Sequence, residues 1–519
     1  MPNPSGWSAT SSVPFSFNNA TDSLLGDTRW SNPTVTYSFP GYGSSWSTNA
    51  FSGYGSSASD EPPWSASFAP LSNADKVSFR AALSAWSGVA NMQFSETQDS
   101  SSSVGDIRAA YGYSADMANA EAAAYRPSNT SVAGDIWFNA FANIASATWS
   151  AGSFSYLTVL HELGHALGLK HPFSDGATLP AALDNVSYTV MSYSAASGAP
   201  GSTFSFYPTT PMVLDIQAIQ YMYGSNQAIR AGNDVYTYND ASTFHQTIWD
   251  GAGTDTLVYN GNINATINLN AGQGSSIGQA VYARDQFGAN LYQLNNIWIA
   301  NGALIENATG GNGNDQITGN AAANIMQGGS GNDTLYGGGD NDTLDGGAGI
   351  DTASFGLSRP NYTLARAGNG WTVTSWSEGV DTTSNIERVK FADSSLALDL
   401  NGNAGQVAKI LGAVFGQAAL ANQSYVGIGL SYLDSGMSYE ELCSLAMNAT
   451  GRTRPGDVVE LLWNNVVKTP LSTGDKSYYV ALLDQGMSVG ALTGFAADTV
   501  LNTDSVNLVG LSLTGIEFI

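Results

Sequence analysis

Apolar and polar residues alternate in short runs within residues 21–225, and such alternation predicts β-strands. The predicted strands cover 34–39, 92–95, 106–110, 122–126 and 135–139. Longer segments carry apolar residues at every third or fourth position, which predicts helices. The predicted helices cover 73–89, 153–168 and 211–223. Strands and helices in this order predict one α/β domain over residues 21–225.

The pattern becomes helical beyond residue 400. Six segments have helical spacing, and they cover 404–416, 423–434, 438–449, 455–467, 476–486 and 488–502. The triplet Gly-Met-Ser occurs at 436–438 and again at 486–488, each time after a segment with Leu-Asp, which suggests an internal duplication. These patterns predict a mainly α-helical module over residues 401–519.

A nine-residue repeat begins at Gly310. Its units cover 310–318, a degenerate 319–327, 328–336, 337–345 and 346–354, with the pattern GGxGxDxUx, where U is apolar. Glycines permit tight turns, and carboxylates with backbone carbonyls are the hard oxygen ligands that suit Ca²⁺. A flexible Gly/Asn-rich linker is the alternative, but the strict phase with Asp at the sixth position argues against it.

Two sets of residues follow from this repeat. The apolar positions expected to face inward are Ile317, Ile325, Leu335, Leu344 and Ala353. The candidate calcium ligands are Gly310, Asn312, Asp315, Gly328, Ser330, Asp333, Gly337, Gly339, Asp342, Gly346, Ala348 and Asp351.

Three of the four histidines lie within residues 161–171. On a helix, His161 and His165 project from one face, and Gly168 can end that helix so that His171 returns as a third ligand. Three protein ligands leave a fourth position open, which is the arrangement of a catalytic zinc. Glu162 could hold a water there. An isolated HExxH can arise by chance, but five fixed identities over eleven positions argue against it.

This stretch resembles the metzincin signature, whose second hallmark is a methionine turn. The sequence Met191-Ser192-Tyr193 is similar to that of the serralysin branch, which consists of secreted bacterial zinc proteases. The resemblance implies that Met191 packs beneath the metal. It also implies that Tyr193 ligates zinc at rest and then stabilises the transition state.

The resemblance extends over 134–139 and 214–224. It implies that a strand over 122–125 accepts peptide substrate at a sheet edge, although an ordinary edge strand is equally compatible with the sequence.

The nonapeptide segment resembles an RTX β-roll, and the resemblance adds further calcium positions ahead of it. They are Arg230, Gly232, Asp234, Asp250, Ala252, Gly253, Asp255 and Glu306. Ala252 and Asp234 depart from the family's usual glycine and threonine. Residues 226–400 are therefore expected to form a β-roll and β-sandwich that bind several calcium ions. Extracellular modules bind Ca²⁺ at about 10⁻⁴–10⁻³ M, so the roll is expected to fold outside the cell. The family resemblance further implies type I secretion with an uncleaved C-terminal signal.

The composition excludes several classes of protein. The chain has 42 acidic and 17 basic residues and a net charge of -25, which argues against nucleic-acid binding. No run of 18 apolar residues predicts a membrane span, and no N-terminal Sec-type signal is recognised. Cys443 is the single cysteine, so an intramolecular disulfide is not possible. Residues 1–20 are expected to be flexible and could form a short propeptide.

These observations predict a multidomain protein: an α/β metzincin domain, a parallel β-roll, and a mainly α-helical C-terminal module. The last resembles a module of uncharacterised role in secreted bacterial proteins. The predicted function is a secreted, calcium-stabilised zinc endopeptidase that acts on extracellular or cell-surface proteins. Type I secretion machinery is the other expected partner. Residues 401–519 could dock to a cell surface, and a secretion or stability appendage is the equally compatible alternative. A narrow processing protease and a non-enzymatic RTX adhesin or surface-layer protein are the alternatives.

Overall fold

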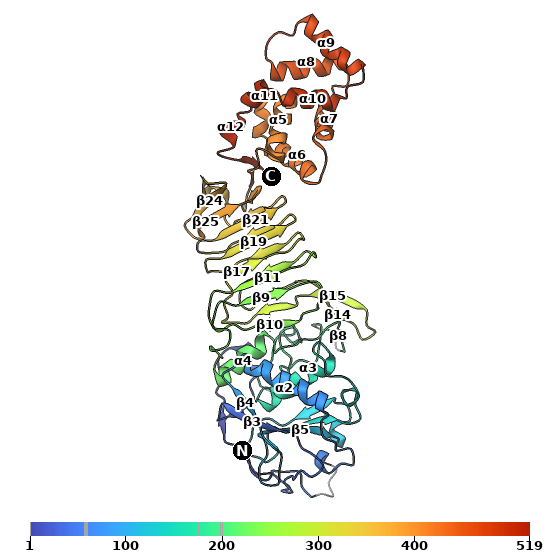
Figure 1. Ribbon diagram of the computed structural model, residues 1–519, viewed down its shortest axis with the longest axis vertical. Coiled ribbons are helices and arrows are strands. Elements are labelled where there is room, and N and C mark those ends of the chain that lie inside the picture. Colours follow the sequence, from blue (N-terminus) through green and yellow to red (C-terminus); the bar gives the residue numbers. More distant parts are fainter. Residues whose placement is uncertain (1, 57–60, 175, 198, 200) are drawn as a thin grey trace. The chain divides into compact units, whose positions relative to one another are not determined.

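The computed structural model describes every residue except 1, 57–60, 175, 198 and 200 (Figure 1). The chain divides into two compact units, Met1–Ile305 and Glu306–Ile519. The boundary lies inside the segment 226–400 that the sequence predicts as one domain. Among the described residues, no helix is both long and apolar enough to span a bilayer.

A five-stranded sheet organises the first part of the first unit. Its strand order is β4 (Gln93–Glu96), β3 (Thr34–Ser38), β5 (Ile107–Gly112), β7 (Ile136–Asn139) and β6 (Ala122–Ala124). The first four strands are parallel, and β6 pairs with β7 in the antiparallel sense. The strands predicted by alternation are confirmed, and β6 forms one edge of the sheet.

Three helices of this unit match the predicted ones. They are α2 (Asn73–Ser87), α3 (Phe154–Ala166) and α4 (Val213–Tyr223). α2 begins at a capping box in which Ser72 and Asp75 satisfy each other's backbone N–H groups. The Trp86 indole on α2 donates to the carbonyl of Leu160 on α3 at 3.2 Å, and both side chains are fully buried. This contact holds α3 in the core.

The N-terminal segment differs from the flexible segment that its composition suggests. Thr10–Ser12 form β1, which pairs with β2 (Thr28–Trp30). Helix α1 (Asn19–Asp22) lies between these two strands in the chain. The Ser8 hydroxyl also donates to the Asp106 carboxylate. Ladder and side-chain hydrogen bonds therefore order a stretch that is poor in apolar residues.

Short strands complete the first unit. β9 (Val235–Tyr238) pairs in parallel with β11 (Thr256–Tyr259). β16 (Ile297–Ile299) lies between β10 (Gln246–Ile248) and β13 (Gly274–Ser275), and β14 (Val281–Arg284) lies between β15 (Asn290–Leu294) and β8 (Thr203–Phe204). A further strand, β12, covers Thr266–Asn268.

The second unit begins with two stacks of short strands. One stack runs β17 (Asn307–Thr309), β19 (Ile325–Ser330), β21 (Thr343–Ala348), β25 (Gly379–Ser384), β24 (Gly370–Ser375) and β23 (Thr363–Ala367). The other runs β18 (Gln316–Thr318), β20 (Thr334–Tyr336), β22 (Thr352–Ser354), β26 (Arg388–Lys390), β27 (Ser395–Ala397) and β28 (Ile516–Phe518). Strands one full turn of the roll apart are parallel, which confirms the β-roll.

The inward positions of the roll correct one prediction. Ile317, Leu335, Leu344 and Ala353 are buried as expected, but Ile325 is 55% exposed. Met326 is the buried residue of the degenerate repeat. Met326 holds the eighth position of that repeat and Ile325 the seventh, so the side-chain alternation of a strand points them to opposite faces.

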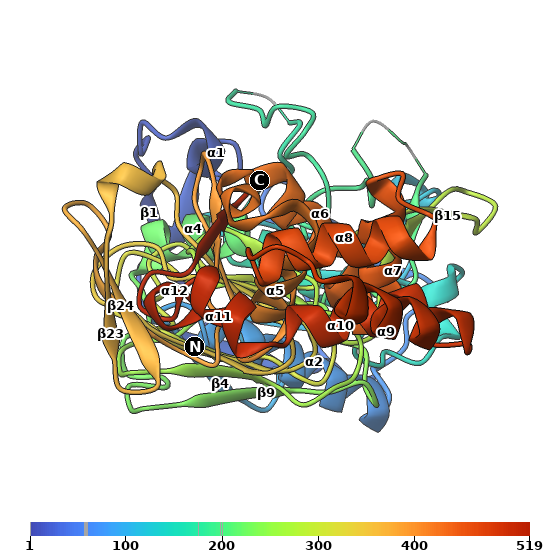
Figure 2. The same ribbon diagram turned by 90° about the horizontal axis from the view of Figure 1, so that it is seen from above.

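Helices form the rest of the second unit (Figure 2). They are α5 (Asn403–Phe415), α6 (Gln423–Asp434), α7 (Tyr439–Ala449), α8 (Pro455–Val466), α9 (Thr473–Asp484), α10 (Val489–Ala497), α11 (Val500–Ser505) and α12 (Leu508–Leu511). Apolar residues of α5 to α10 and of α12 share one core, which confirms the predicted helical module. Arg388 on β26 pairs with Asp399 and with Asp434 at the end of α6, so an ion-pair group ties the roll to the helices.

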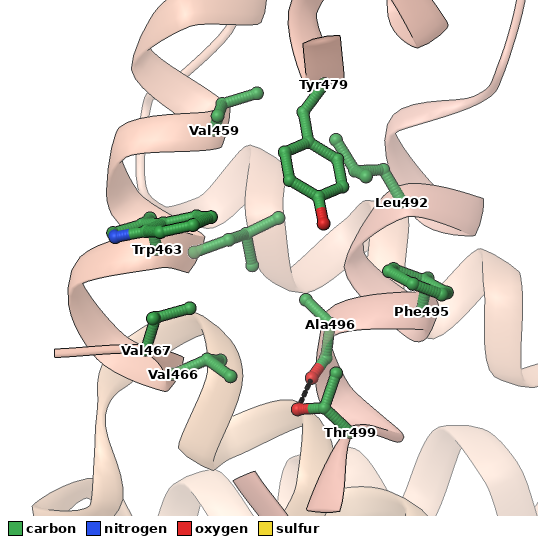
Figure 3. A pocket seen from close by; sticks show the side chains of 10 residues that line it. Val459, Trp463, Val466, Val467, Tyr479, Leu492, Phe495, Ala496 and Thr499 are labelled. Carbon is green, nitrogen blue, oxygen red and sulfur yellow. Dashed lines mark hydrogen bonds between the residues drawn. The ribbon is translucent and has the colours of Figure 1, made fainter. Parts of the chain in front are cut away.

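The helical module contains an apolar pocket between α8, α9 and α10 (Figure 3). The Tyr479 ring points into it between Trp463 on one side and Leu492 and Phe495 on the other. The Thr499 hydroxyl at its lower end donates to the Ala496 carbonyl at 2.8 Å.

Candidate metal centres

Helix α3 and the loop after it bring three histidines together. α3 ends at Ala166, and Gly168 with φ +110° lets the chain turn back to His171. His171 Nε2 lies 3.1 Å from His161 Nε2 and 2.9 Å from His165 Nε2. The three nitrogens therefore converge on one point, as the spacing of the motif predicts.

Backbone carbonyls orient two of these rings. His161 Nδ1 donates to the Val190 carbonyl at 2.8 Å, and His165 Nδ1 donates to the Leu169 carbonyl at 2.9 Å. With the proton on Nδ1, the Nε2 lone pair of each ring is available to a metal. Burial and the nearby His171 lower the pKa of His161 to about 4. Burial and the charges of Arg126 and Lys170 lower the pKa of His171 to about 4. Neutral imidazoles at neutral pH fit a zinc ion.

Glu162 is a buried carboxylate with one unsatisfied oxygen. It is 5% exposed, and its Oε2 has no hydrogen-bond partner among the described residues. Burial raises the pKa of Glu162 to about 8. The residue lines a cavity of about 400 Å³ together with His161 and Tyr193. An unpaired buried carboxylate oxygen is costly unless another group binds it, so this geometry fits a water or a substrate atom beside the histidines.

The methionine turn packs against the metal helix at a glycine. Met191 is fully buried, and a Cβ added to Gly164 would lie 2.5 Å from its sulfur. Gly164 sits between His161 and His165, so the absence of a side chain there lets Met191 lie directly under the histidines.

A buried carboxylate that the sequence reasoning missed orders this turn. Asp215 on α4 is fully buried and accepts the Thr189 hydroxyl at 2.6 Å and the Val190 amide at 2.7 Å. The Val190 carbonyl in turn accepts from His161. Asp215 therefore orients a candidate zinc ligand through the backbone of one residue, Val190. The apolar periodicity of α4 gave no signal for it.

Tyr193 and Phe173 lie at the open side of the triad. The Tyr193 hydroxyl is 2.8 Å from His171 Nε2, and the side chain is 64% exposed. The Phe173 ring stacks on His171 at a centroid distance of 5.1 Å and an interplanar angle of 9°. Tyr193 is therefore in contact with His171 and largely exposed to solvent. Phe173 is a contact that sequence reasoning missed.

Three carboxylates meet ahead of the roll. Asp234, Asp250 and Asp255 place oxygens within 4.8 Å of one another. Gly253 has φ +139°, and a Cβ there would lie 1.9 Å from the Gly232 carbonyl, so the two predicted segments touch through glycines.

The neighbouring predicted positions lie in the same two loops. The Arg230 guanidinium stacks over Tyr236 at 4.8 Å, and the Ala252 amide donates to Asp250 at 3.1 Å. Clustered carboxylates of this kind fit Ca²⁺.

The repeat aspartates form two ladders along the roll. In the first, the Asp315 amide donates to Asp333 Oδ1 at 2.7 Å, and the Asp333 amide donates to Asp351 Oδ1 at 2.8 Å. In the second, the Asn324 amide donates to Asp342 Oδ1 at 2.8 Å. Asp333, Asp342 and Asp351 each use one carboxylate oxygen in these ladders.

The other oxygens remain free to bind calcium. Oδ2 of Asp333, Asp342 and Asp351 is buried and has no hydrogen-bond partner among the described residues. Burial raises the pKa of Asp333 and Asp342 to about 6 and that of Asp351 to about 7. The repeat glycines make room for these carboxylates: a Cβ on Gly328 would lie 2.3 Å from Asp333 Oδ2. Inward oxygen donors without partners fit Ca²⁺.

Two further acidic residues extend the ladders and were missed. The Asp342 amide donates to Asp381 at 2.8 Å, and the Asp351 amide donates to Glu387 at 2.9 Å. These pairs are 39 and 36 residues apart instead of 18, because the β23–β25 segment interrupts the repeat. Periodicity therefore could not find them.

The degenerate repeat departs from the calcium pattern. Asn324 replaces the aspartate, and its amide donates to the Glu306 carbonyl at 2.6 Å and to Asn320 at 3.1 Å. An amide nitrogen facing these oxygens takes the place that a cation would need.

Comparisons with known proteins identify two segments of this chain. Residues 68–193 match the matrixin family, and residues 302–329 and 318–353 match the RTX calcium-binding nonapeptide repeat (4 copies). The chain therefore contains a matrixin-family segment and RTX repeats, and it resembles serralysins. The prediction of zinc and calcium as cofactors is thereby confirmed.

Several curated relatives resemble this serralysin-like chain. It is 35% identical over 289 residues to the metalloprotease AprA of Pseudomonas entomophila, 31% over 296 residues to serralysin of Photorhabdus laumondii, and 29% over 309 residues to serralysin of Proteus mirabilis. The alignments cover 50, 52 and 51% of this chain. The chain spans 56, 58 and 59% of the length of these relatives.

Proposed function

We propose that the chain is a secreted, calcium-stabilised zinc endopeptidase. The observation that carries this is the convergence of three histidine Nε2 atoms beside a buried carboxylate with a free oxygen. His161, His165 and His171 would hold the zinc. When bound, that ion would polarise a scissile carbonyl and lower the pKa of a water to about 7.

The chain's own residues would supply the proton transfers. Glu162 Oε2 would accept a proton from the attacking water and return it to the leaving amine. Tyr193 would release His171 and donate its hydroxyl to the oxyanion that forms on the substrate. The Met191 turn and Asp215 would keep His161 in place during this cycle.

Calcium binding supports the secreted part of the proposal. Three buried carboxylate oxygens in the roll have no partner among the described residues, so the roll would be most stable where Ca²⁺ is abundant. Export by type I machinery and docking of the helical module to a surface remain parts of this proposal. Neither the processing protease nor the non-enzymatic adhesin is favoured by the comparisons.

The test is the variant Glu162→Gln. It keeps the shape of the side chain and removes the base, so cleavage of a casein substrate should fall about a thousandfold. Zinc should still bind at one ion per chain, as measured by competition with a chelator in excess calcium. Glu460→Gln on α8 makes the same charge change in the helical module and should cleave normally. Retained cleavage by Glu162→Gln would refute the assignment.

A further inference from the structure

A second cavity is lined by two of the histidines and does not include Glu162 in its lining. Its volume is about 1020 Å³, and its lining includes His165, His171, Arg126 and Lys170. Arg126 follows the edge strand β6 by two residues and is exposed. Its guanidinium has neither a hydrogen bond nor an ion pair with any residue that the structure describes. An exposed cation therefore faces the cleft beside two candidate zinc ligands.

The position of this guanidinium is constrained by packing. A Cβ on Gly26 would lie 3.0 Å from Arg126 Nη1 and 2.4 Å from the Gly168 carbonyl. The Arg126 side chain therefore lies over the bare backbone of Gly26, next to the turn that leads to His171. A side chain held in this way loses less freedom when it binds a ligand.

The other charged residues that line this cavity are Asp22, Asp27 and Lys170. Asp22 accepts the amides of Ser16 and Phe17, and Asp27 is exposed in the N-terminal segment. The Lys170 ammonium donates to the Ala177 carbonyl at 2.8 Å.

The direction of β6 decides which part of a substrate Arg126 would meet. Residues 119–122 line the cavity that contains Glu162, and residues 124–126 line the second cavity. No strand covers the outer edge of β6 in the described sheet. A peptide added antiparallel to β6 would place its N-terminal part beside Arg126 and its C-terminal part beside Glu162.

We propose that Arg126 makes the enzyme select substrates with an acidic side chain among the first few residues before the scissile bond. A guanidinium can bind a carboxylate with two parallel hydrogen bonds, which a neutral glutamine side chain cannot match. This inference rests on the proposed function, because it needs a peptide bond to be cleaved at the histidines.

The experiment uses the full chain with zinc and calcium and pairs of fluorogenic peptides. The two members of a pair differ only by Glu or Gln at one of the four positions before the scissile bond. At one or more positions, kcat/KM should be about fivefold higher for Glu, which is typical of an exposed charge pair, and this ratio should shrink with added salt.

Four variants separate charge from folding. Arg126→Gln keeps the stem over Gly26 and should bring the ratio near one, and Arg126→Lys should retain part of the preference. Arg126→Glu should reverse the preference toward a peptide with Lys at that position, which a merely structural defect would not do. Arg454→Gln removes the same charge in the helical module and should leave the ratio unchanged.

The outcomes distinguish the two proposals. Cleavage of Glu and Gln peptides at equal rates by the unaltered chain, or an unchanged ratio in Arg126→Gln, would overturn the role of Arg126 alone. Absence of zinc-dependent cleavage of any peptide would overturn the proposed function as well.

Discussion

The contact between Gly164 and Met191 makes a prediction whose sign depends on two opposing effects. An alanine at position 164 would gain about 1 kcal/mol from helix propensity. Its Cβ, however, would lie 2.5 Å from the Met191 sulfur and 3.3 Å from Trp86 Cζ2, and both neighbours are fully buried. Overpacking of this kind costs about 1–3 kcal/mol. We therefore expect Gly164→Ala to lower the free energy of unfolding by about 1 kcal/mol.

The Gly164→Ala variant should also bind zinc more weakly. Pushing Met191 away shifts the adjacent Val190, whose carbonyl holds His161 at 2.8 Å. Loss of such an outer contact typically weakens metal binding at least tenfold. Denaturation followed by tryptophan fluorescence would measure stability, and competition with a chromogenic chelator in excess calcium would measure zinc affinity.

A double-mutant cycle isolates the contact. Met191→Ala alone should cost about 2–5 kcal/mol because it leaves a cavity, and the alanine methyl of Gly164→Ala should fill part of that cavity. The double variant should therefore cost less than the sum of the two. Gly494→Ala on α10 is the matched control, since its nearest neighbour is 3.5 Å away. Additive costs, or a Gly164→Ala variant that is more stable with unchanged zinc affinity, would refute the reasoning.

Three further predictions concern the carboxylates. Asp215→Asn would place an amide N–H₂ opposite the Thr189 hydroxyl or the Val190 amide, both of which are donors. The free energy of unfolding should therefore fall by about 2 kcal/mol, and zinc affinity should fall about tenfold. Denaturation and chelator competition would measure the two effects. Asn324→Asp removes the amide that donates to Glu306, so the calcium-free roll should become less stable, and calorimetry should detect one additional calcium ion. The raised pKa values of Asp333 and Asp351, about 6 and 7, mean that the folded calcium-free roll binds more protons than the unfolded chain between about pH 4 and 7. Its stability should therefore rise on acidification from pH 8 to 5, whereas with saturating calcium it should fall because protons displace the ion.

Clear results would contradict each of them. Unchanged zinc affinity in the Asp215 variant would mean that the carboxylate does not act through Val190. An Asn324→Asp chain with the same calcium count as the unaltered one would show that this turn already holds an ion. A calcium-free roll that loses stability on acidification would mean that its carboxylates are paired in another way.

The sequence by itself determined the features that depend on local spacing. Four residues separate His161 and His165, so any helix there puts them on one face, and Gly168 permits the turn that returns His171. The nine-residue phase likewise fixed the β-roll and its aspartates, because each turn repeats the same backbone geometry. Helical periodicity located α5 to α10 for the same reason.

Only the tertiary structure decided which distant groups meet. Asp215 reaches the Val190 peptide because α4 packs under the methionine turn, and Arg126 faces the histidines because β6 lies at the sheet edge. Glu387 joins an aspartate ladder because the chain returns to the roll after an insertion that breaks the repeat. The residue pattern along a helix or strand determines only which side chains share a face of that element. The contacts above depend on how elements that are far apart in the chain pack together.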